Sequence, residues 1–346
     1  MIDVQMRKCA NVQIRLPIRI KFLAAPLLIV LIVFMIAGCM PPDPGIWKNN
    51  QIKSGDRDHF HELNAQLFKA IKAGNVHDVE DMMSQQMLDD NSAKRKIDLI
   101  GNRLKTNEYS IFDEYYIVHQ YIGDQTIKTD TGHLNDYKLH YQSVTREMYV
   151  GLFLPKSGAD QYMISVIYAK YKYGWRIYFF DVQQYTTTGK NAPALYNLAK
   201  QQYAQGYLMK ALNTMKLSRD CAIPVTIWLY RNDGEMDDFY RKLITEAGQK
   251  YRFPVFISNV PGVEILGVDT QPMNDGPCPA VSYITKVSVN DTNAVKKENL
   301  AIQKAIGKVF PGIDVGEKYI YYTAFNHLPK GKKGSPPYFD ITQKLK

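Results

Sequence analysis

The chain has 346 residues and a formal net charge of +9. This length allows two domains or more. The basic residues are scattered, apart from a small cluster at Lys330, Lys332 and Lys333, and no basic stripe alternates with aromatic residues. The sequence therefore gives no support for binding to nucleic acid.

An apolar run at residues 22–39 follows a basic segment. The basic residues are Arg7, Lys8, Arg15, Arg19 and Lys21. A basic segment, an apolar core and small residues before a cleavage point make up a secretory signal peptide. The run ends in Ile36-Ala37-Gly38-Cys39, which resembles the lipobox of bacterial lipoproteins. This resemblance implies cleavage after Gly38, so that residues 1–38 are the signal peptide, and attachment of lipid to the Cys39 thiol.

The same run has an alternative interpretation as an uncleaved transmembrane helix. Residues 22–38 are short for a membrane span, and Pro26 within them does not favour a helix. Two or three acyl chains on Cys39 would make a durable anchor, whereas a single chain binds a membrane only marginally. Removal of the signal peptide takes away five basic residues and Asp3, which lowers the formal charge from +9 to +5.

Residues 39–57 contain prolines, a glycine and asparagines and show little periodicity, so they are predicted to be a flexible tether. Some bacterial lipoproteins carry an acidic cluster after the lipidated cysteine as a signal for surface export, and none follows Cys39 here. We therefore expect a protein of the bacterial cell envelope, lipid-anchored to a membrane and facing the periplasm.

Two cysteines remain after Cys9 leaves with the signal peptide and Cys39 takes the lipid. Cys221 and Cys278 would lie in an oxidising compartment, where such a pair often forms a disulfide, and each precedes an apolar, strand-like run. Two separate buried thiols are the alternative. No CxxC motif is present, so neither a zinc site nor a redox site of that type is predicted, and we expect no metal and no cofactor.

Residues 58–188 are predicted to begin with helices. Apolar residues at spacings of three and four indicate a first amphipathic helix; they are Phe60, Leu63, Leu67 and Ile71. Gly74 suits the left-handed end of that helix, and Asn75 suits the cap of a second one. A further helical stretch covers 92–104.

Strands follow the helices. The pattern predicts them at 111–121, 137–144, 147–154, 162–172 and 175–182. Helices followed by a run of strands are typical of an antiparallel sheet packed on helices, so the fold class is α+β.

Two motifs in this region resemble a known family. The helix–turn–helix around Ala73-Gly74-Asn75 resembles the opening hairpin of NTF2-like (cystatin-like, SnoaL-type) domains, and Tyr173-Gly174-Trp175-Arg176-Ile177 resembles the last β-hairpin of the same family. The resemblance implies a cone-shaped α+β domain over residues 58–188, with helices lying across a curved antiparallel sheet. We expect Trp175 on the buried face of that sheet.

Residues 191–223 resemble a single tetratricopeptide repeat, with small residues such as Ala199 and Ala211 at helix contacts and Gly206 in the turn. A solenoid needs about three repeats to bury its core, so we interpret this segment as a helical hairpin that joins two domains.

Residues 224–346 are predicted to form a C-terminal α+β domain. The strands are expected at 225–230, 254–258, 280–289 and 318–325, and the helices at 235–251 and 293–310. This β-α-β-β-α-β order permits a ferredoxin-like fold. Residues 261–279 are predicted to be a loop, and 339–342 an additional edge strand.

The sharpest catalytic hypothesis concerns Asp113 and Tyr115. Some NTF2-like enzymes use an aspartate base beside a tyrosine that donates a hydrogen bond, and residues i and i+2 of a strand share a face. The alternative is a strand with its tyrosines packed inward and its acids in solvent. His59 and His61 are a poor metal pair, since i and i+2 on a helix point in different directions.

The sequence thus favours a membrane-anchored, non-enzymatic lipoprotein that binds an envelope protein or a small apolar ligand. A small-molecule enzyme that uses Asp113 and Tyr115 is the alternative, and a purely structural protein is the third possibility. The position of Asp113, in a pocket or in solvent, distinguishes the first two.

Overall fold

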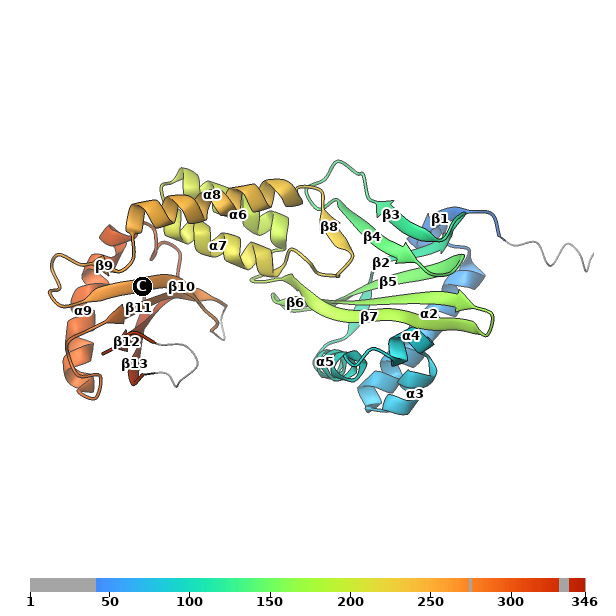
Figure 1. The fold of residues 1–346 in the computed structure, drawn as a ribbon, viewed down its shortest axis with the longest axis horizontal. Helices are drawn as coiled ribbons and strands as arrows, with labels where there is room; N and C mark the ends of the chain where they lie inside the picture. Colours follow the sequence, from blue (N-terminus) through green and yellow to red (C-terminus); the bar gives the residue numbers. More distant parts are fainter. Residues whose placement is uncertain (1–41, 274–275, 330–335, 346) are drawn as a thin grey trace, which may run out of the picture. The chain divides into compact units, whose positions relative to one another are not determined.

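The computed structural model describes residues 42–273, 276–329 and 336–345. The predicted signal peptide and Cys39 lie outside these residues. All helices and strands of the described part belong to the compact unit Gly45–Lys346 (Figure 1). Mixed helices and mostly antiparallel sheets confirm the predicted α+β class.

A first sheet of five antiparallel strands has the order β1-β2-β5-β6-β7. Its strands are β1 (Gly45–Lys48), β2 (Tyr109–Val118), β5 (Glu147–Pro155), β6 (Gln161–Tyr171) and β7 (Gly174–Thr186). β2, β5, β6 and β7 correspond to predicted strands. Their side chains alternate between two apolar cores, one on each face of the sheet.

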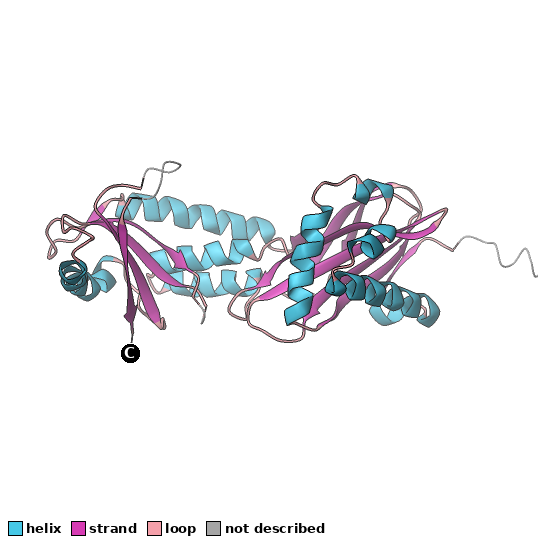
Figure 2. Cartoon of the chain, turned by 90° about the horizontal axis from the view of Figure 1, so that it is seen from below, coloured by secondary structure: helices cyan, strands magenta, loops and turns pink. Residues whose placement is uncertain are grey.

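One face of this sheet packs against helices (Figure 2). These are α2 (Ser54–Ala73), α3 (Val76–Asp81), α4 (Gln85–Leu88) and α5 (Ala93–Thr106). Gly74 ends α2 with φ of 71°, and the Asn75 side chain accepts a hydrogen bond from the Asp78 backbone N–H, as the sequence predicts. Phe60 and Leu67 of α2 are buried against the sheet, and Trp175 is half-buried beside Phe60.

The other face of the first sheet carries a small sheet of three strands. Its order is β3-β4-β8, from β3 (Gly123–Lys128), β4 (Tyr137–Ser143) and β8 (Trp228–Tyr230). β3 was not predicted. β8 was predicted to begin the C-terminal domain, but it pairs with β4 instead, and the Trp228 ring stacks on Tyr137 with centroids 3.6 Å apart.

The expected helical hairpin is α6 (Ala192–Ala204) and α7 (Leu208–Asp220), joined at Gly206 with φ of 81°. α8 (Asp233–Tyr251) follows β8 and packs on α7. One apolar core continues from Tyr115 and Leu139, through Leu212 of the hairpin, to Tyr283 and Tyr322 near the C-terminus. The hairpin is therefore part of the core.

The C-terminal sheet has the order β13-β12-β11-β10-β9. Its strands are β9 (Val255–Phe256), β10 (Glu264–Gln271), β11 (Cys278–Ile284), β12 (Tyr319–Phe325) and β13 (Tyr338–Lys344), and α9 (Thr292–Val309) connects β11 to β12. β11 and β12 are parallel, and the other pairs are antiparallel. β13 confirms the predicted edge strand.

Three predictions need correction. The predicted ferredoxin-like strand order is wrong. β8 belongs to the sheet with β3 and β4, and the strands of the C-terminal sheet lie side by side in sequence order, from β9 to β13. Residues 261–279 are not all loop, since they contain β10, whose alternation is broken by a bulge between Ile265 and Gly267. The tether does not extend to residue 57, because β1 begins at Gly45 and α2 at Ser54.

Candidate functional site

Asp113, the predicted catalytic base, lies on β2 next to a second carboxylate, Glu114. A bulge between Ile111 and Asp113 shifts the register of β2 against β5. Asp113 is 7% exposed and Glu114 is 4% exposed. Neither acid is in solvent, so the alternative interpretation of this strand is wrong about the acids.

Both oxygens of Asp113 have partners within the protein. Asn49 Nδ2 donates to Oδ1 at 2.9 Å, and the Tyr137 hydroxyl donates to Oδ2 at 2.5 Å. Lys48 Nζ lies 2.8 Å from the same Oδ2. The Tyr115 hydroxyl is 2.7 Å from that of Tyr137. The Tyr137 hydroxyl has one hydrogen, and it uses this hydrogen to donate to the Asp113 carboxylate. The Tyr115 hydroxyl must therefore be the donor in its hydrogen bond with Tyr137.

Electrostatics in this cluster follow from burial and pairing. Burial by itself lowers the pKa of Lys48, but the hydrogen bond to Asp113 and the charges around it outweigh burial and raise it. Burial is the largest cause that raises the pKa of both Tyr115 and Tyr137. Both phenols therefore stay protonated and act as hydrogen-bond donors at neutral pH.

Glu114 anchors a second network. Its carboxylate lies 3.0 Å from His61 Nε2 and accepts a hydrogen bond from the Tyr149 hydroxyl at 2.8 Å. Asn64 Nδ2 donates to that same hydroxyl at 3.2 Å. His61 thus joins α2 to the sheet.

Asn49 connects the two networks. Its amide nitrogen donates to Asp113, and its amide oxygen accepts the Glu114 backbone N–H at 2.8 Å. Asn49 has a positive φ of 49°, which asparagine tolerates better than most residues. The Asp113 carboxylate and the Glu114 backbone N–H therefore hold the end of β1 and its following turn against β2. Sequence reasoning missed Lys48 and Asn49 because they lie in the predicted tether, and the only signal was the short apolar pair Ile46-Trp47 between prolines and asparagines.

The two cysteines do not form the predicted disulfide. Both are free and buried, which is the alternative that the sequence left open. Cys221 caps the end of α7 instead of preceding a strand, whereas Cys278 is the first residue of β11. Burial raises the pKa of the Cys221 thiol to about 12 and also raises that of Cys278, so both are protonated and unreactive at neutral pH.

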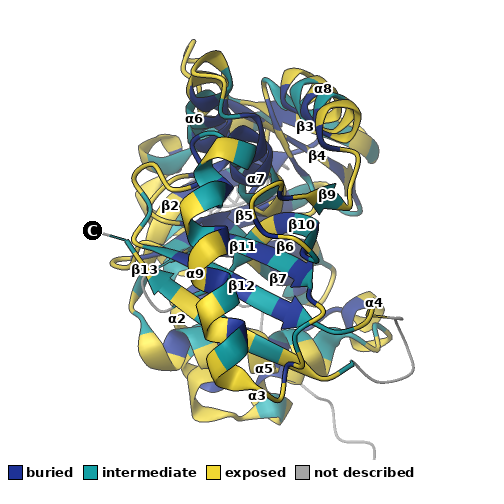
Figure 3. Cartoon of the chain, turned by 90° about the vertical axis from the view of Figure 1, so that its left-hand side faces the viewer, coloured by how far each residue is buried: buried dark blue, intermediate teal, exposed yellow. Residues whose placement is uncertain are grey.

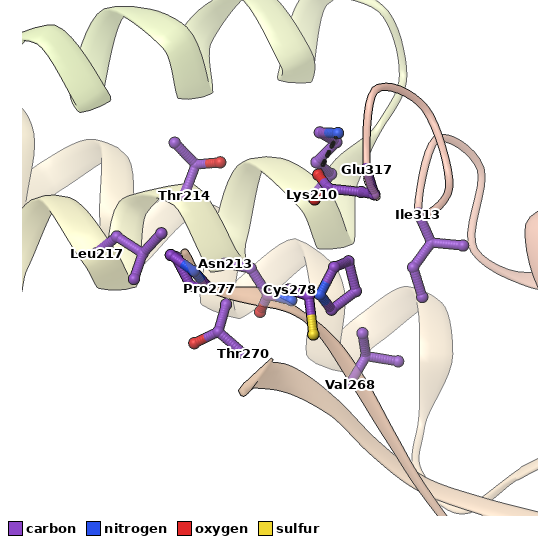
Figure 4. Close-up of a pocket in the computed structure, with 11 residues that line it drawn as sticks. Lys210, Asn213, Thr214, Leu217, Val268, Thr270, Pro277, Cys278, Ile313 and Glu317 are labelled. Atoms are coloured by element: carbon purple, nitrogen blue, oxygen red, sulfur yellow. Dashed lines mark hydrogen bonds and ion pairs between the residues drawn. The ribbon is translucent and has the colours of Figure 1, made fainter. Parts of the chain in front are cut away.

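Cys278 lies in a pocket where α7 meets the C-terminal sheet (Figure 4). Lys210 Nζ and Glu317 Oε1 pair there at 2.6 Å. Asn213 Nδ2 donates to the Asp269 carbonyl at 3.0 Å, while the buried Oδ1 of Asn213 has no hydrogen-bond partner in the described structure. The cavity measures only about 50 Å³, and polar side chains such as Thr214 and Thr270 line it together with apolar ones. Binding sites for drug-sized molecules measure roughly 300–1,000 Å³, so this cavity is too small for such a ligand.

The C-terminal sheet also has a face that α9 does not cover, which we call the open face. α9 crosses one face of this sheet (Figure 3). Asn299 of α9 donates to the Tyr283 hydroxyl at 3.4 Å, so the covered face is the one that carries the buried Tyr283 and Tyr322. Alternate residues point to the other side. The aromatic and aliphatic residues of the open face are Phe256, Ile284, Tyr319, Tyr321, Phe325 and Tyr338. Phe256 is 67% exposed and Tyr338 is 55% exposed.

No family model, curated protein or solved structure matches this chain. Within the described residues, no cluster of three or more histidine, cysteine, aspartate or glutamate side chains could hold a metal ion. No helix in the same residues is long and apolar enough to cross a membrane.

Proposed function

We propose that this protein is a lipoprotein of the bacterial cell envelope, anchored through Cys39 and facing the periplasm, whose body binds an envelope protein without catalysing a reaction. The lipobox-like Ile36-Ala37-Gly38-Cys39 behind a basic segment supports the anchor. We also propose that residues 58–188 form an NTF2-like domain, with β1 added to its sheet, since α2 and α3 meet at Gly74 and β6 and β7 meet at Gly174, where the resemblance places those turns.

The state of Asp113 supports a binding protein over an enzyme. A general base must reach the proton that it removes from a substrate. Asp113 is instead enclosed, and its oxygens are already bonded to Asn49, Tyr137 and Lys48. Through these contacts Asp113 holds β1 on the sheet, which is a structural role.

The observation that carries the binding proposal is the open face. Aromatic residues are enriched at protein interfaces, because they bury a large area at low entropic cost. Tyr321, Phe325 and Tyr338 lie on adjacent strands of this face, and the rings of Phe325 and Tyr338 are 6.1 Å apart.

The test is site-specific photo-crosslinking in intact membranes. A benzophenone amino acid would replace Tyr338 or Phe256 on the open face, and Leu300 on the exposed side of α9 as a control. We expect the same protein adduct, identified by mass spectrometry, from positions 338 and 256 and none from 300. Adducts that are absent from the open face, or equal at all three positions, would contradict the proposal.

A further inference from the structure

The register of the first sheet shows which turns lie beside the end of β1. Gly45 pairs with Val118 at the end of β2, and Val118 pairs with Glu147 at the start of β5. Lys170 Nζ bonds the Glu147 carboxylate at 2.9 Å and belongs to the last residues of β6. The turns 119–122, 144–146 and 172–173 therefore lie at the same end of the sheet as Gly45 (Figure 1).

This end of the sheet exposes large apolar and aromatic side chains. Tyr121 is 73% exposed and Tyr173 is 59% exposed, and Ile46 and Ile122 beside them are also exposed. The Tyr171 and Tyr173 rings stack with centroids 5.3 Å apart, so the tip between β6 and β7 presents an ordered aromatic pair. Tyrosine and tryptophan are the residues enriched where proteins meet the interface of a lipid bilayer.

The same end carries more basic than acidic side chains. The basic side chains are Arg146, Lys170, Lys172 and Arg176. The acidic ones are Asp124 and Glu147, together with the exposed Asp43 just before β1. Glu147 is already paired with Lys170 and with the Tyr116 hydroxyl. The Arg176 guanidinium lies 5.3 Å from the Tyr173 ring centroid, so cation and aromatic groups form one surface. Such a surface is complementary to anionic lipid head groups.

Chain length limits how far this end can be from the anchor. Only residues 40–44 separate Cys39 from Gly45. Six extended steps reach about 20 Å at most. The five strands of the sheet, at about 4.8 Å spacing, span about the same distance. An acylated Cys39 therefore keeps these turns within reach of the lipid surface.

We propose that the turns 119–122, 144–146 and 172–173, which we call the basal turns, dock on the anionic phospholipid surface of the membrane that holds the anchor. Tyr121, Ile122 and Tyr173 enter the head-group region, and Lys172 and Arg176 contact lipid phosphates. This inference rests on the proposed function, because it requires lipid on Cys39. Docking of the basal turns would fix the orientation of the folded protein relative to the membrane. A lipid anchor alone would leave the folded protein free to rotate on its tether.

The test uses the full chain, purified with its lipid and reconstituted in vesicles of phosphatidylethanolamine and phosphatidylglycerol. A fluorophore is attached to Tyr173→Cys or Ile122→Cys, with Leu300→Cys on α9 as the matched exposed control. The native Cys221 and Cys278 are buried and do not compete for the label. Lipids with a nitroxide at the head group report proximity. We expect quenching at positions 173 and 122 to exceed that at 300 several-fold.

Equal quenching at the three positions would overturn the docking proposal. The intact mass of the same sample separates the two failures. An acyl mass on Cys39 with equal quenching leaves the lipoprotein standing and removes the docking, whereas the absence of any acyl mass removes the proposed anchor and the docking with it.

Charge reversal tests the role of the basic residues. Lys172→Glu with Arg176→Glu should reduce quenching at position 173 to the level seen at 300. Lys297→Glu with Lys304→Glu on α9 changes the net charge equally and should leave it unchanged. A loss of quenching in both pairs would contradict a local contact and indicate only a general effect of net charge.

Discussion

At the scale of single residues, Asp113 is the clearest case of a predicted site with a different role. The sequence correctly indicated that Asp113 and Tyr115 belong to one polar group, because period two in a strand puts them on one face. It could not show Lys48, Asn49 and Tyr137, which approach from other parts of the chain. Those partners decide that the carboxylate is enclosed.

Asp113→Asn should destabilise the protein, because it removes the charge that Lys48 Nζ faces and weakens the bond from Tyr137. Hydrogen bonds to charged groups contribute about 1.5–3 kcal/mol, so we expect the free energy of unfolding to fall by about 2–3 kcal/mol. Urea unfolding measures it, with the exposed Asp124→Asn as the control, which should change it by less than about 0.5 kcal/mol. Equal effects of the two variants would contradict the network.

We expect His119 to make the stability of the protein depend on pH. Its Nδ1 faces the carbonyls of Thr145 and Arg146, at 3.2 and 3.1 Å, so Nδ1–H donates and Nε2 accepts from the Tyr141 hydroxyl at 3.0 Å. Burial lowers the pKa of His119 below its ordinary value of 6.5. The unfolded chain therefore takes up a proton at a higher pH than the folded protein does. Stability from this residue is present above about pH 6.5 and is lost as the pH falls.

Unfolding free energies measured from pH 7.5 to 5 should thus decline more steeply in the natural protein than in His119→Gln. The difference in slope should approach about 1 kcal/mol per pH unit. His77→Gln on the exposed surface of α3 is the control and should keep the natural slope. Parallel curves for His119→Gln and the natural protein would show that the ring takes up its proton equally in both states.

The thiols give a second test at this scale. Because burial raises the pKa values of Cys221 and Cys278, neither should react with iodoacetamide in the folded protein at neutral pH. Both should react after unfolding without reductant, since both are free. A Cys221–Cys278 peptide in a non-reducing digest would contradict the structure and restore the disulfide that the sequence suggested.

At the scale of elements, the long periodic segments were predictable and the short ones were not. α2 carries a clear period of 3.6 and β4 a clear period of two. β1 has only four residues between proline-rich sequence and Asn49, so no period can form. Its place depends on pairing with β2 and on the Asp113 side chain, which contacts Lys48 and Asn49. β8 has three residues, and its place is set by the stack of Trp228 on Tyr137.

Trp175 shows the limit of pattern reading within a correctly predicted strand. The turn at Gly174 begins β7, as expected, and the Trp175 ring meets Phe60 edge-on with centroids 5.0 Å apart. The ring is half-buried instead of buried, because it stands in the second residue of the strand, at the end of the sheet. Alternation predicts which face a residue takes, whereas depth depends on how far the helices extend over that face.

Gly312 tests the contact between the hairpin and the C-terminal part. A Cβ added at Gly312 would collide with the Tyr207 ring, and the φ of Gly312 is 81°. Gly312→Ala should destabilise through both the clash and the left-handed backbone, by about 2–4 kcal/mol. Gly316→Ala is the matched control, because its φ is 72° and nothing lies within 4 Å of the added Cβ. Urea unfolding should show a larger loss for Gly312→Ala. Equal losses would mean that Tyr207 does not pack there.

At the scale of the whole molecule, the hairpin α6–α7 is a structural junction. The continuous core passes through it, and Lys210 and Asn213 of α7 bond Glu317 and the Asp269 carbonyl in the C-terminal part. A repeat-like pattern predicted two helices and a turn, but a single repeat gives no information about its partners. The hairpin therefore connects the first sheet, which follows the tether, with the C-terminal sheet, which carries the open face.

The proposed location of the protein and its proposed docking on the membrane both depend on the lipid anchor at Cys39. The most direct measurement is the intact mass of the protein isolated from bacterial membranes, with Cys39→Ser as the comparison. We predict a chain that begins at Cys39 and carries the mass of two or three acyl chains, and for Cys39→Ser an unprocessed precursor without lipid. A natural protein that begins at another residue, or that carries no acyl mass, would contradict the account.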